Sequence, residues 1–370
     1  MTILHVSGAR GWGGGENHIE SLCLELKESN PEIKNIVLCL KGDLFNERLI
    51  KTDIITETAP LFTNLDFRFV FKIISVSKKY KVDLIHLHDS TAMTLSIIAD
   101  KFYNLPPFIF SKKTSFPIRK KKSTLFKYNY PKIKKIICVS NESKKVTEEA
   151  IIDLSKIITV YQGTSLLNKS TETPFLLREK FSIPESKKII GTIGNHVAAK
   201  NLETLIETAN IVINQKKRTD FIFIQIGIFT DRTEGLLKLV KDLNLENDII
   251  FLGYTPNASN FIPQFDGFIL TSEIEGMPEV LFESFYHKKP VISTNVGGIP
   301  EIIEDCVNGF LTPAKDPKAL SEKLIYLFDN KELISKFVEV SYKKQTENFT
   351  GYMMAQNTLN EYKKILNINS

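Results

Sequence analysis

Residues 267–283 read GFILTSEIEGMPEVLFE and combine an apolar run, a glycine-containing loop and the start of a helical pattern. The apolar run Gly267–Thr271 has the length of a buried strand. Pro278 suits the first turn of a helix, because the amide hydrogen that proline lacks would have no partner there, and Gly276 precedes it. A strand, a short loop and a helix in this order are typical of a parallel sheet covered by helices.

The same alternation of short apolar runs and longer helical patterns extends along the chain in two series. In the first series the predicted strands are Ile3–Ser7, Asn35–Leu40, Leu84–His88, Phe108–Ser111, Ile136–Ser140 and Ile157–Tyr161, with helical patterns such as Ile19–Lys27 and Val70–Tyr80 between them. In the second they are Lys188–Ile193, Phe221–Gly227, Ile249–Leu252, Gly267–Thr271, Pro290–Thr294 and Phe310–Thr312. The sequence therefore predicts an α/β protein with two Rossmann-like, doubly wound parallel sheets, which bind ligands at the carboxyl ends of their strands.

A polar stretch with glycine and proline, Gln162–Ser186, separates the two series and is predicted to be a linker. We therefore expect an N-terminal domain over residues 1–165 and a C-terminal domain over residues 166–349. The remaining segment, residues 350–370, contains the helical pattern Tyr352–Leu366 and should pack back on the N-terminal domain. The two domains are expected to face each other across a cleft.

The composition is that of a soluble globular protein. Hydrophobic residues make up 42% of the chain and charged residues 25%, and no apolar run reaches the roughly 18–20 residues that a membrane span needs. The N-terminus carries no signal-peptide pattern, so we expect a cytoplasmic protein, either free or peripheral on the inner face of the plasma membrane. The scattered cysteines Cys23, Cys39, Cys138 and Cys306 form no CxxC or CxxH pair, which favours buried thiols over a metal site.

The net charge of +5 is concentrated in one basic segment, residues 112–135, and no acidic residue lies between Asp100 and Glu142. Its basic side chains are Lys112, Lys113, Arg119, Lys120, Lys121, Lys122, Lys127, Lys132, Lys134 and Lys135. The segment is either a solvated face or a surface for anionic lipid headgroups or a phosphate-bearing acceptor. No known nucleic-acid-binding module accompanies it, so nucleic acid is not an expected partner.

A glycine loop, Gly11-Trp12-Gly13-Gly14-Gly15-Glu16, follows the first predicted strand. Glycines allow a backbone to approach a phosphate closely, and the N-terminus of the following helix favours negative charge. A tight strand–helix turn is the alternative. The loop matches neither G-x-G-x-x-G nor the P-loop pattern, which disfavours an oxidoreductase or a P-loop NTPase.

Two glutamates in the opening stretch are eight residues apart, Glu275 in the loop and Glu283 more than one turn inside the predicted helix. An ionised carboxylate only accepts hydrogen bonds and can bind a vicinal diol through both oxygens. One glutamate near a sugar and one near a ribose would therefore span a nucleotide-sugar. Without further context, two such glutamates also fit a solvated helix face.

The block Glu275-x7-Glu283 with Gly276 and Pro278, followed by KPVISTNVGGIPE at 289–301 and NGFL at 308–311, resembles the retaining glycosyltransferase family 4. The similarity continues in GGGE at 13–16, DLIHLH at 83–88, GNHVAAKN at 194–201, Gly227 and Gly253. It implies a GT-B fold, a UDP- or GDP-sugar donor, retention of anomeric configuration, and no cofactor or metal. Independently, the sequence has no D-x-D motif that could hold a divalent cation on a diphosphate.

The resemblance also implies a set of site residues. Lys200 would contact the donor diphosphate, Glu283 the ribose and Glu275 the donor sugar. The other donor-binding positions are Gly14, Gly15, Asn195, Gly276, Met277, Pro278 and Glu279. Glu275 and Lys200 are the expected catalytic residues of the C-terminal domain, and His88 and Lys113 those of the N-terminal domain.

This chain departs from the family pattern at two positions. Family members usually carry an arginine five residues before the diphosphate lysine, whereas this chain has Asn195, followed by His196 as a candidate replacement for the charge. Where the family commonly has a histidine after the fourth strand we place Lys113, which could contact a phosphate or an anionic acceptor.

His86 and His88 lie two residues apart and share one face of a predicted strand. A metal site is disfavoured, because only Asp89 is near enough in the sequence to complete the ligand set. His88 is expected either near the donor or acceptor or in a structural hydrogen bond.

The implied activity is transfer of a sugar to a glycan or glycolipid acceptor in cell-surface polysaccharide or lipopolysaccharide synthesis. Asn195 and Lys113 motivate an alternative, a non-catalytic GT-B subunit that partners an active transferase. A further alternative is another GT-B enzyme, such as a sugar-nucleotide epimerase or a phosphorylase. The presence of Glu275, Glu283 and Lys200 favours transfer.

Overall fold

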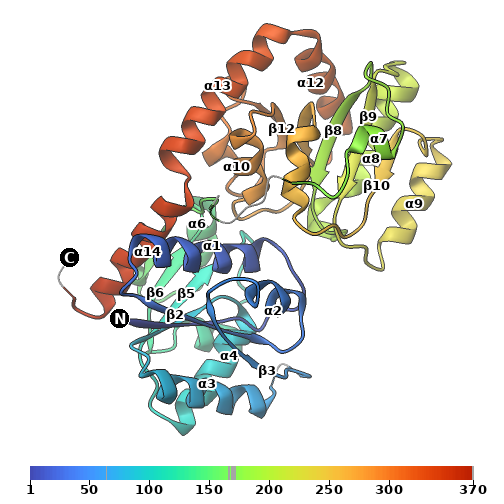
Figure 1. Cartoon of the computed structure of the whole chain (residues 1–370). Helices are drawn as coiled ribbons and strands as arrows, with labels where there is room; N and C mark the ends of the chain where they lie inside the picture. Colours follow the sequence, from blue (N-terminus) through green and yellow to red (C-terminus); the bar gives the residue numbers. More distant parts are fainter. Residues whose placement is uncertain (64, 166, 168–171, 369–370) are drawn as a thin grey trace. The chain divides into compact units, whose positions relative to one another are not determined.

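The computed structural model describes residues 1–63, 65–165, 167 and 172–368, and the chain divides into two compact units (Figure 1). Unit 1 comprises Met1–Leu167 together with Phe349–Ser370, and unit 2 comprises Asn168–Asn348. The last helix of the chain therefore belongs to the same unit as the first strand.

Unit 1 contains a seven-stranded parallel sheet in the order β3-β2-β1-β4-β5-β6-β7. The strands are β1 (Thr2–Val6), β2 (Lys34–Leu40), β3 (Ile55–Ala59), β4 (Leu84–Leu87), β5 (Phe108–Lys112), β6 (Ile133–Cys138) and β7 (Ile157–Thr159). The helices are α1 (Gly14–Ser29), α2 (Leu44–Leu49), α3 (Phe67–Tyr80), α4 (Ser90–Phe102), α5 (Lys122–Tyr128), α6 (Asn141–Glu148), η1 (Leu154–Lys156) and α14 (Gly351–Ile365). The strand order reverses between β1 and β4, and the loops after these two strands therefore flank a switch-point crevice.

Unit 2 contains a six-stranded parallel sheet in the order β10-β9-β8-β11-β12-β13. The strands are β8 (Lys188–Ile193), β9 (Phe221–Ile226), β10 (Ile249–Phe251), β11 (Gly267–Leu270), β12 (Val291–Thr294) and β13 (Phe310–Thr312). The helices are α7 (Leu177–Lys180), η2 (Ala198–Lys200), α8 (Leu202–Asn210), η3 (Ile211–Gln215), α9 (Thr233–Asp242), η4 (Ala258–Gln264), α10 (Glu279–Tyr286), α11 (Ile299–Ile302), α12 (Pro317–Asp329) and α13 (Lys331–Asn348). Here the order reverses between β8 and β11.

Five of the described strands are buried along their whole length, β4 and β5 in unit 1 and β9, β11 and β12 in unit 2. Such continuous burial is typical of parallel sheets that helices cover on both faces. The two doubly wound parallel sheets predicted from the sequence are therefore confirmed.

Helix α14 packs against α1 inside unit 1 (Figure 1). Its apolar side chains Met354, Leu359 and Tyr362 join a core cluster that also contains Ile3 and Leu22. Burial of this apolar surface holds the C-terminal helix on the first unit.

The structure differs from the sequence-based expectations in three places. The strand β3 was not predicted, because its sequence ITETA is polar and lies at the sheet edge, where burial is incomplete. The predicted linker contains the short helix α7, whose Leu177 is fully buried, while residues 166 and 168–171 of that stretch lie outside the described residues. Cys306 is exposed, whereas the other three cysteines are buried as expected.

No helix in the described part of the chain is both long and apolar enough to cross a lipid bilayer.

Candidate functional site

The loops after β8 and β11 form the first candidate site, at the switch point of the unit 2 sheet. Because β8 and β11 are parallel neighbours, their carboxyl ends lie at the same edge. The Thr271 hydroxyl lies 3.1 Å from the carbonyl oxygens of both Lys200 and Asn201 and donates to them. The Glu273 amide donates to the carbonyl of Ala199 at 2.8 Å. These bonds hold the two loops against each other.

An ion pair between Lys200 and Glu275 connects these loops through their side chains. Lys200 Nζ lies 2.6 Å from Glu275 Oε1, and the Ser272 hydroxyl donates to the same oxygen at 2.6 Å. The lysine and glutamate side chains are 22% and 11% exposed, so water reaches the pair only partly. A Cβ at Gly194 would lie 3.1 Å from the Cε of Lys200, so the glycine leaves room for the lysine chain. The structure thus brings together two of the sequence-predicted site residues.

Helix α10 carries the second predicted glutamate of this unit. It begins at Glu279, and Pro278 occupies the N-cap with ψ 115°, so the prediction that Pro278 lies in the first turn is wrong by one residue. Glu283 is one turn after Glu279, and both side chains point to the same face of the helix and are 6% exposed. The first amide groups of a helix have no intrahelical acceptor, which favours negative charge beside them.

The loop before α10 is fixed by its neighbours. The Gly276 carbonyl accepts from the Gly298 amide at 2.9 Å, at the start of α11. The Thr294 hydroxyl donates to the Ser272 carbonyl at 2.6 Å, and Met277 is buried at 4% exposure. The backbone predicted to bind the donor is therefore rigidly supported from β12 and α11.

Asn195 and His196 have structural roles in the loop after β8. Asn195 Oδ1 accepts from the Ile228 amide at 3.0 Å. His196 is almost fully buried, with its two ring nitrogens 2.9 Å from the Thr233 hydroxyl and 2.7 Å from Gln225 Oε1. Burial lowers the pKa of His196, which favours the neutral imidazole. The expectation that His196 replaces the missing arginine charge is therefore wrong.

The glycine loop of unit 1 leads into α1, which begins at Gly14. Gly11 has φ +85° and needs a residue without Cβ. A Cβ added at Gly14 or Gly15 would meet no atom within 4 Å, so the space beside the first turn of α1 is open. Lys113 Nζ donates to the Gly15 carbonyl at 2.7 Å. The structure thus brings the predicted residue Lys113 to the glycine loop.

His88 lies in a buried cluster with three other histidines, His5, His18 and His86. His88 Nε2 is 3.0 Å from His5 Nδ1, and the His18 ring meets the His88 ring edge-on. Burial lowers the pKa of His5 to about 4 and the pKa of the other three well below the usual value, so all four imidazoles are neutral near pH 7. His88 is 5% exposed, which places it inside the cluster rather than on an open surface.

Three of these histidines, His5, His86 and His88, offer nitrogen atoms within 4.8 Å of one another, a donor set that could hold a metal ion. The hydrogen bonds compete with that role. His5 Nδ1 and His88 Nε2 bond to each other, and the His86 nitrogens lie 2.6 Å from the Tyr362 hydroxyl and 2.7 Å from the Ser111 hydroxyl. An ion would have to replace bonds that already satisfy most of these nitrogens.

His5 was not predicted from the sequence as a member of this cluster. His5 and His86 are register partners on the neighbouring strands β1 and β4. Part of the signal was available, because both histidines lie in runs predicted to be strands of one sheet, but the adjacency of these strands was not predicted.

Comparisons with known proteins agree with this architecture. Residues 175–344 match the sequence model described as glycosyl transferases group 1, and residues 12–166 match that of glycosyltransferase family 4. The UDP-Gal:alpha-D-GlcNAc-diphosphoundecaprenol alpha-1,3-galactosyltransferase of Escherichia coli is 25% identical over 283 residues, 72% of each chain. The capsular polysaccharide biosynthesis glycosyltransferase CapH of Staphylococcus aureus is 24% identical over 277 residues, 73% of this chain and 75% of the relative. The crystal structure of Anabaena HepE in complex with UDP and glucose has a TM-score of 0.84 at 18% identity, covering 98% of this chain and 100% of HepE.

Proposed function

The chain belongs to the GT-B glycosyltransferases of the family 4 type, and from this premise we propose that it transfers a sugar from a nucleotide-sugar to a glycan or glycolipid acceptor, without a metal and with retention of anomeric configuration. The relatives named above include glycosyltransferases of cell-surface polysaccharide synthesis, which supports the same role for this chain. We propose a UDP-sugar as donor, since the Escherichia coli relative is named for UDP-galactose and HepE was crystallised with UDP.

The observation that carries this proposal is the Lys200–Glu275 pair at the switch point of unit 2. Departure of the nucleoside diphosphate leaves charge on its phosphate oxygens, and a fixed cation there stabilises the transition state. Lys200 supplies that cation. It can exchange its bond to Glu275 for a bond to phosphate, and the Glu275 carboxylate can then accept hydrogen bonds from sugar hydroxyls.

The remaining donor contacts come from α10 and the loop before it. Glu283 accepts hydrogen bonds from the ribose diol, as a carboxylate with two oxygens can. The backbone of Gly276, Met277 and Glu279 presents amide groups to the phosphates, and the positive end of α10 adds to their effect.

Unit 1 supplies further donor contacts and the acceptor side of the reaction. Gly14 and Gly15 leave open space for the donor at the start of α1, and Lys113, which donates to the Gly15 carbonyl, can contact a phosphate or an anionic sugar. The neutral, buried His88 supports this region through its bond to His5 rather than by moving a proton.

Retention can be tested on the sugar that water releases slowly from the donor in the absence of acceptor. We expect the protein in EDTA to hydrolyse a UDP-α-sugar and to release the α-anomer first, seen by proton NMR before mutarotation. The Lys200→Met variant serves as the control for contaminating hydrolases. Release of the β-anomer first would contradict retention, and formation of an epimerised UDP-sugar would support the epimerase alternative instead.

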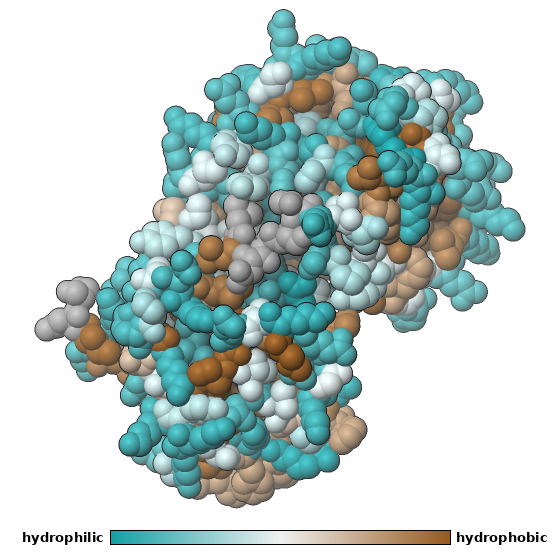
Figure 2. Space-filling model, in the orientation of Figure 1, coloured by the Kyte–Doolittle hydropathy of each residue, from teal (hydrophilic) through white to brown (hydrophobic). Residues whose placement is uncertain are grey.

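We also propose that unit 1 binds anionic membrane surfaces through the basic segment 112–135. An exposed aromatic cluster on α3 and α4 of the same unit supports the proposal: Phe67, Phe71 and Phe102 contact one another at ring distances of 6.1–6.5 Å and are more than half exposed. Figure 2 shows apolar surface at the α3 end of this unit among hydrophilic residues. Aromatic side chains next to lysines suit the interface between lipid headgroups and water.

We expect the protein to sediment with phosphatidylglycerol vesicles and not with phosphatidylcholine vesicles, because the lysines add favourable electrostatic energy only on anionic lipid. Phe71→Ser, on the exposed face of α3, should reduce sedimentation several-fold. Tyr326→Ser, which removes an exposed aromatic of unit 2, is the matched control. Equal binding to both vesicle types would contradict the proposal.

A further inference from the structure

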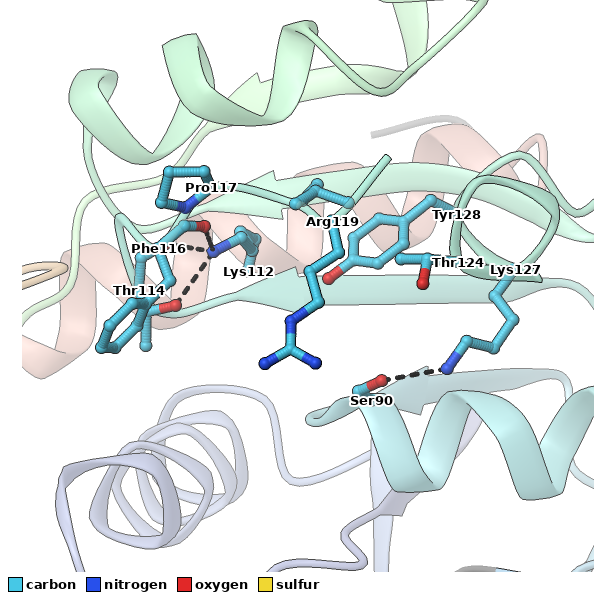
Figure 3. A pocket seen from close by; sticks show the side chains of 10 residues that line it. Ser90, Lys112, Thr114, Phe116, Pro117, Arg119, Thr124, Lys127 and Tyr128 are labelled. Carbon is cyan, nitrogen blue, oxygen red and sulfur yellow. Dashed lines mark hydrogen bonds between the residues drawn. The ribbon is translucent and has the colours of Figure 1, made fainter. Parts of the chain in front are cut away.

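A pocket of about 360 Å³ lies in unit 1 between the N-terminus of α4, the loop after β5 and helix α5 (Figure 3). Its lining residues are Ser90, Lys112, Thr114, Phe116, Pro117, Ile118, Arg119, Thr124, Lys127 and Tyr128. It lies at the carboxyl edge of the sheet, where open α/β folds bind ligands. Its volume is within the range of small-molecule sites. The donor and acceptor contacts proposed above do not use it.

The pocket contains three cations and no carboxylate among its lining residues: Lys112, Arg119 and Lys127. Other basic side chains of unit 1 do pair with acids, for example Lys120 with Glu149 at 3.3 Å just outside the pocket. Clustered positive charge without counter-charge disfavours the folded state through self-repulsion, and a bound anion removes that cost.

Lys112 lines the pocket and holds the following loop, residues 114–116, by hydrogen bonds. Its ammonium donates to Thr114 Oγ1 at 2.9 Å and to the Phe116 carbonyl at 3.0 Å, and it also contacts the Thr114 carbonyl. All these partners are neutral. Burial lowers the pKa of Lys112 to about 8, which leaves the charged form predominant at pH 7 and without a neutralising acid. The buried positive charge of Lys112 therefore fixes, through these hydrogen bonds, the loop that carries Arg119.

Arg119 and Lys127 supply the other charged donors of the pocket. In the described part of the chain, Arg119 has no hydrogen-bond or ionic partner, and Figure 3 shows its guanidinium extending into the opening. Lys127 donates only to hydroxyl groups, those of Ser90 at 3.2 Å and Thr94 at 3.1 Å. The Tyr128 hydroxyl is drawn above the guanidinium, and burial raises its pKa to about 12, so it remains a donor.

Asp89 directly precedes the lining residue Ser90, and its carboxylate is hydrogen-bonded to backbone amides. Its carboxylate accepts from the amides of Thr91 and Ala92 at 2.8 Å each and from the amide of Gly8 at 2.7 Å. It therefore caps α4 and fixes the loop after β1, and it is not among the lining residues of the pocket.

We propose that this pocket is a phosphoryl-binding subsite, in which Arg119 and Lys127 hold a phosphate or diphosphate group carried by the acceptor. A guanidinium binds two phosphate oxygens at once through parallel N–H groups, and an ammonium adds a point charge. The apolar walls formed by Phe116 and Ile118 suit the uncharged part of such a ligand. The subsite itself follows from the pocket alone, and only its assignment to the acceptor rests on the proposed transferase function.

The test is calorimetric titration of the full chain with inorganic pyrophosphate. Pyrophosphate can also occupy the proposed donor site, so the titration is made in the Lys200→Met background. We expect Arg119→Gln and Lys127→Gln each to weaken pyrophosphate binding about tenfold, because each removes a charge-assisted hydrogen bond. Lys122→Gln, which changes the net charge equally but lies outside the pocket lining, should leave binding unchanged.

Unchanged pyrophosphate binding in both pocket variants, with melting temperatures equal to that of the parent, would overturn the subsite. If the transferase function is wrong, Lys200→Met alone does not change pyrophosphate binding, while Arg119→Gln and Lys127→Gln still weaken it. Failure of the proposed function can therefore be distinguished from failure of the subsite. Vesicles containing phosphatidic acid identify the source of the phosphate. Loss of vesicle binding in Arg119→Gln indicates a lipid headgroup, and retained vesicle binding with lost pyrophosphate binding indicates a soluble phosphate-bearing acceptor.

Discussion

Lys200→Met is expected to reduce kcat/KM for sugar transfer about 10³-fold while the protein remains folded. The substitution keeps the length of the side chain but removes its positive charge, which in the structure lies beside Glu275. Removing one group that stabilises transition-state charge typically costs about 10²–10³ in kcat, and a full positive charge is at the upper end. The measurement is steady-state release of UDP from the donor in the presence of acceptor.

This variant also removes the positive charge beside Glu275, which complicates its interpretation. The carboxylate is 11% exposed and retains the bond from Ser272, so we expect a loss of about 1–2 kcal/mol in the free energy of unfolding. The double variant Lys200→Met with Glu275→Gln separates the two effects. It should recover stability, because the glutamine carries no negative charge that has lost the nearby Lys200 cation, and should recover no activity. Recovery of activity would mean that Lys200 only neutralises Glu275.

Glu283→Gln is expected to weaken UDP binding about 100-fold, since two hydrogen bonds to a charged acceptor contribute about 1.5 kcal/mol or more each. Glutamine preserves the shape of the buried side chain on α10, so the fold should be unaffected. The measurement is calorimetric titration with UDP.

Glu273→Gln is the matched control for this experiment. Glu273 lies in the loop after β11, where it forms an ion pair with Lys315 at 2.9 Å rather than with Lys200. We expect its UDP affinity to equal that of the unmodified protein. Equal affinity in Glu283→Gln would contradict the ribose contact and transfer that role to another residue of α10.

The fold was predictable because its signal lies in short apolar runs. The strands Lys188–Ile193 and Phe310–Thr312 have the predicted bounds, and the other predicted strands differ from the observed bounds by no more than a few residues. Buried parallel strands are apolar throughout and therefore easily seen. The edge strand β3 lacks that signal, since its residues are mostly half-exposed, and it was missed.

The candidate site was predictable in its residue types but not in its contacts. The resemblance to family 4 implied Lys200 and Glu275 as site residues, yet their ion pair depends on the adjacency of β8 and β11, strands far apart in the chain. His196 shows the opposite case. Its position beside Asn195 suggested a replacement charge, whereas the fold turns its ring inward onto Gln225 and Thr233. The direction of a side chain depends on tertiary packing, so it could not be predicted for His196 from the sequence alone.

The pocket of Figure 3 and the aromatic cluster on α3 and α4 also depended on tertiary structure. The sequence showed the basic segment, but which of its cations have acidic partners is decided by neighbours such as Glu149 and Asp100. Phe71 and Phe102 come from different helices and meet only in the folded unit.

Calorimetric titration of the unmodified protein with UDP, GDP and ADP in EDTA tests the central claim most directly. We expect saturable binding of UDP at one site per chain, much weaker binding of ADP, and no change when Mg²⁺ replaces EDTA. Absence of binding by all three nucleotides would contradict a nucleotide-sugar-dependent transferase and support a non-catalytic GT-B subunit, and binding that requires Mg²⁺ would contradict the metal-independent mechanism.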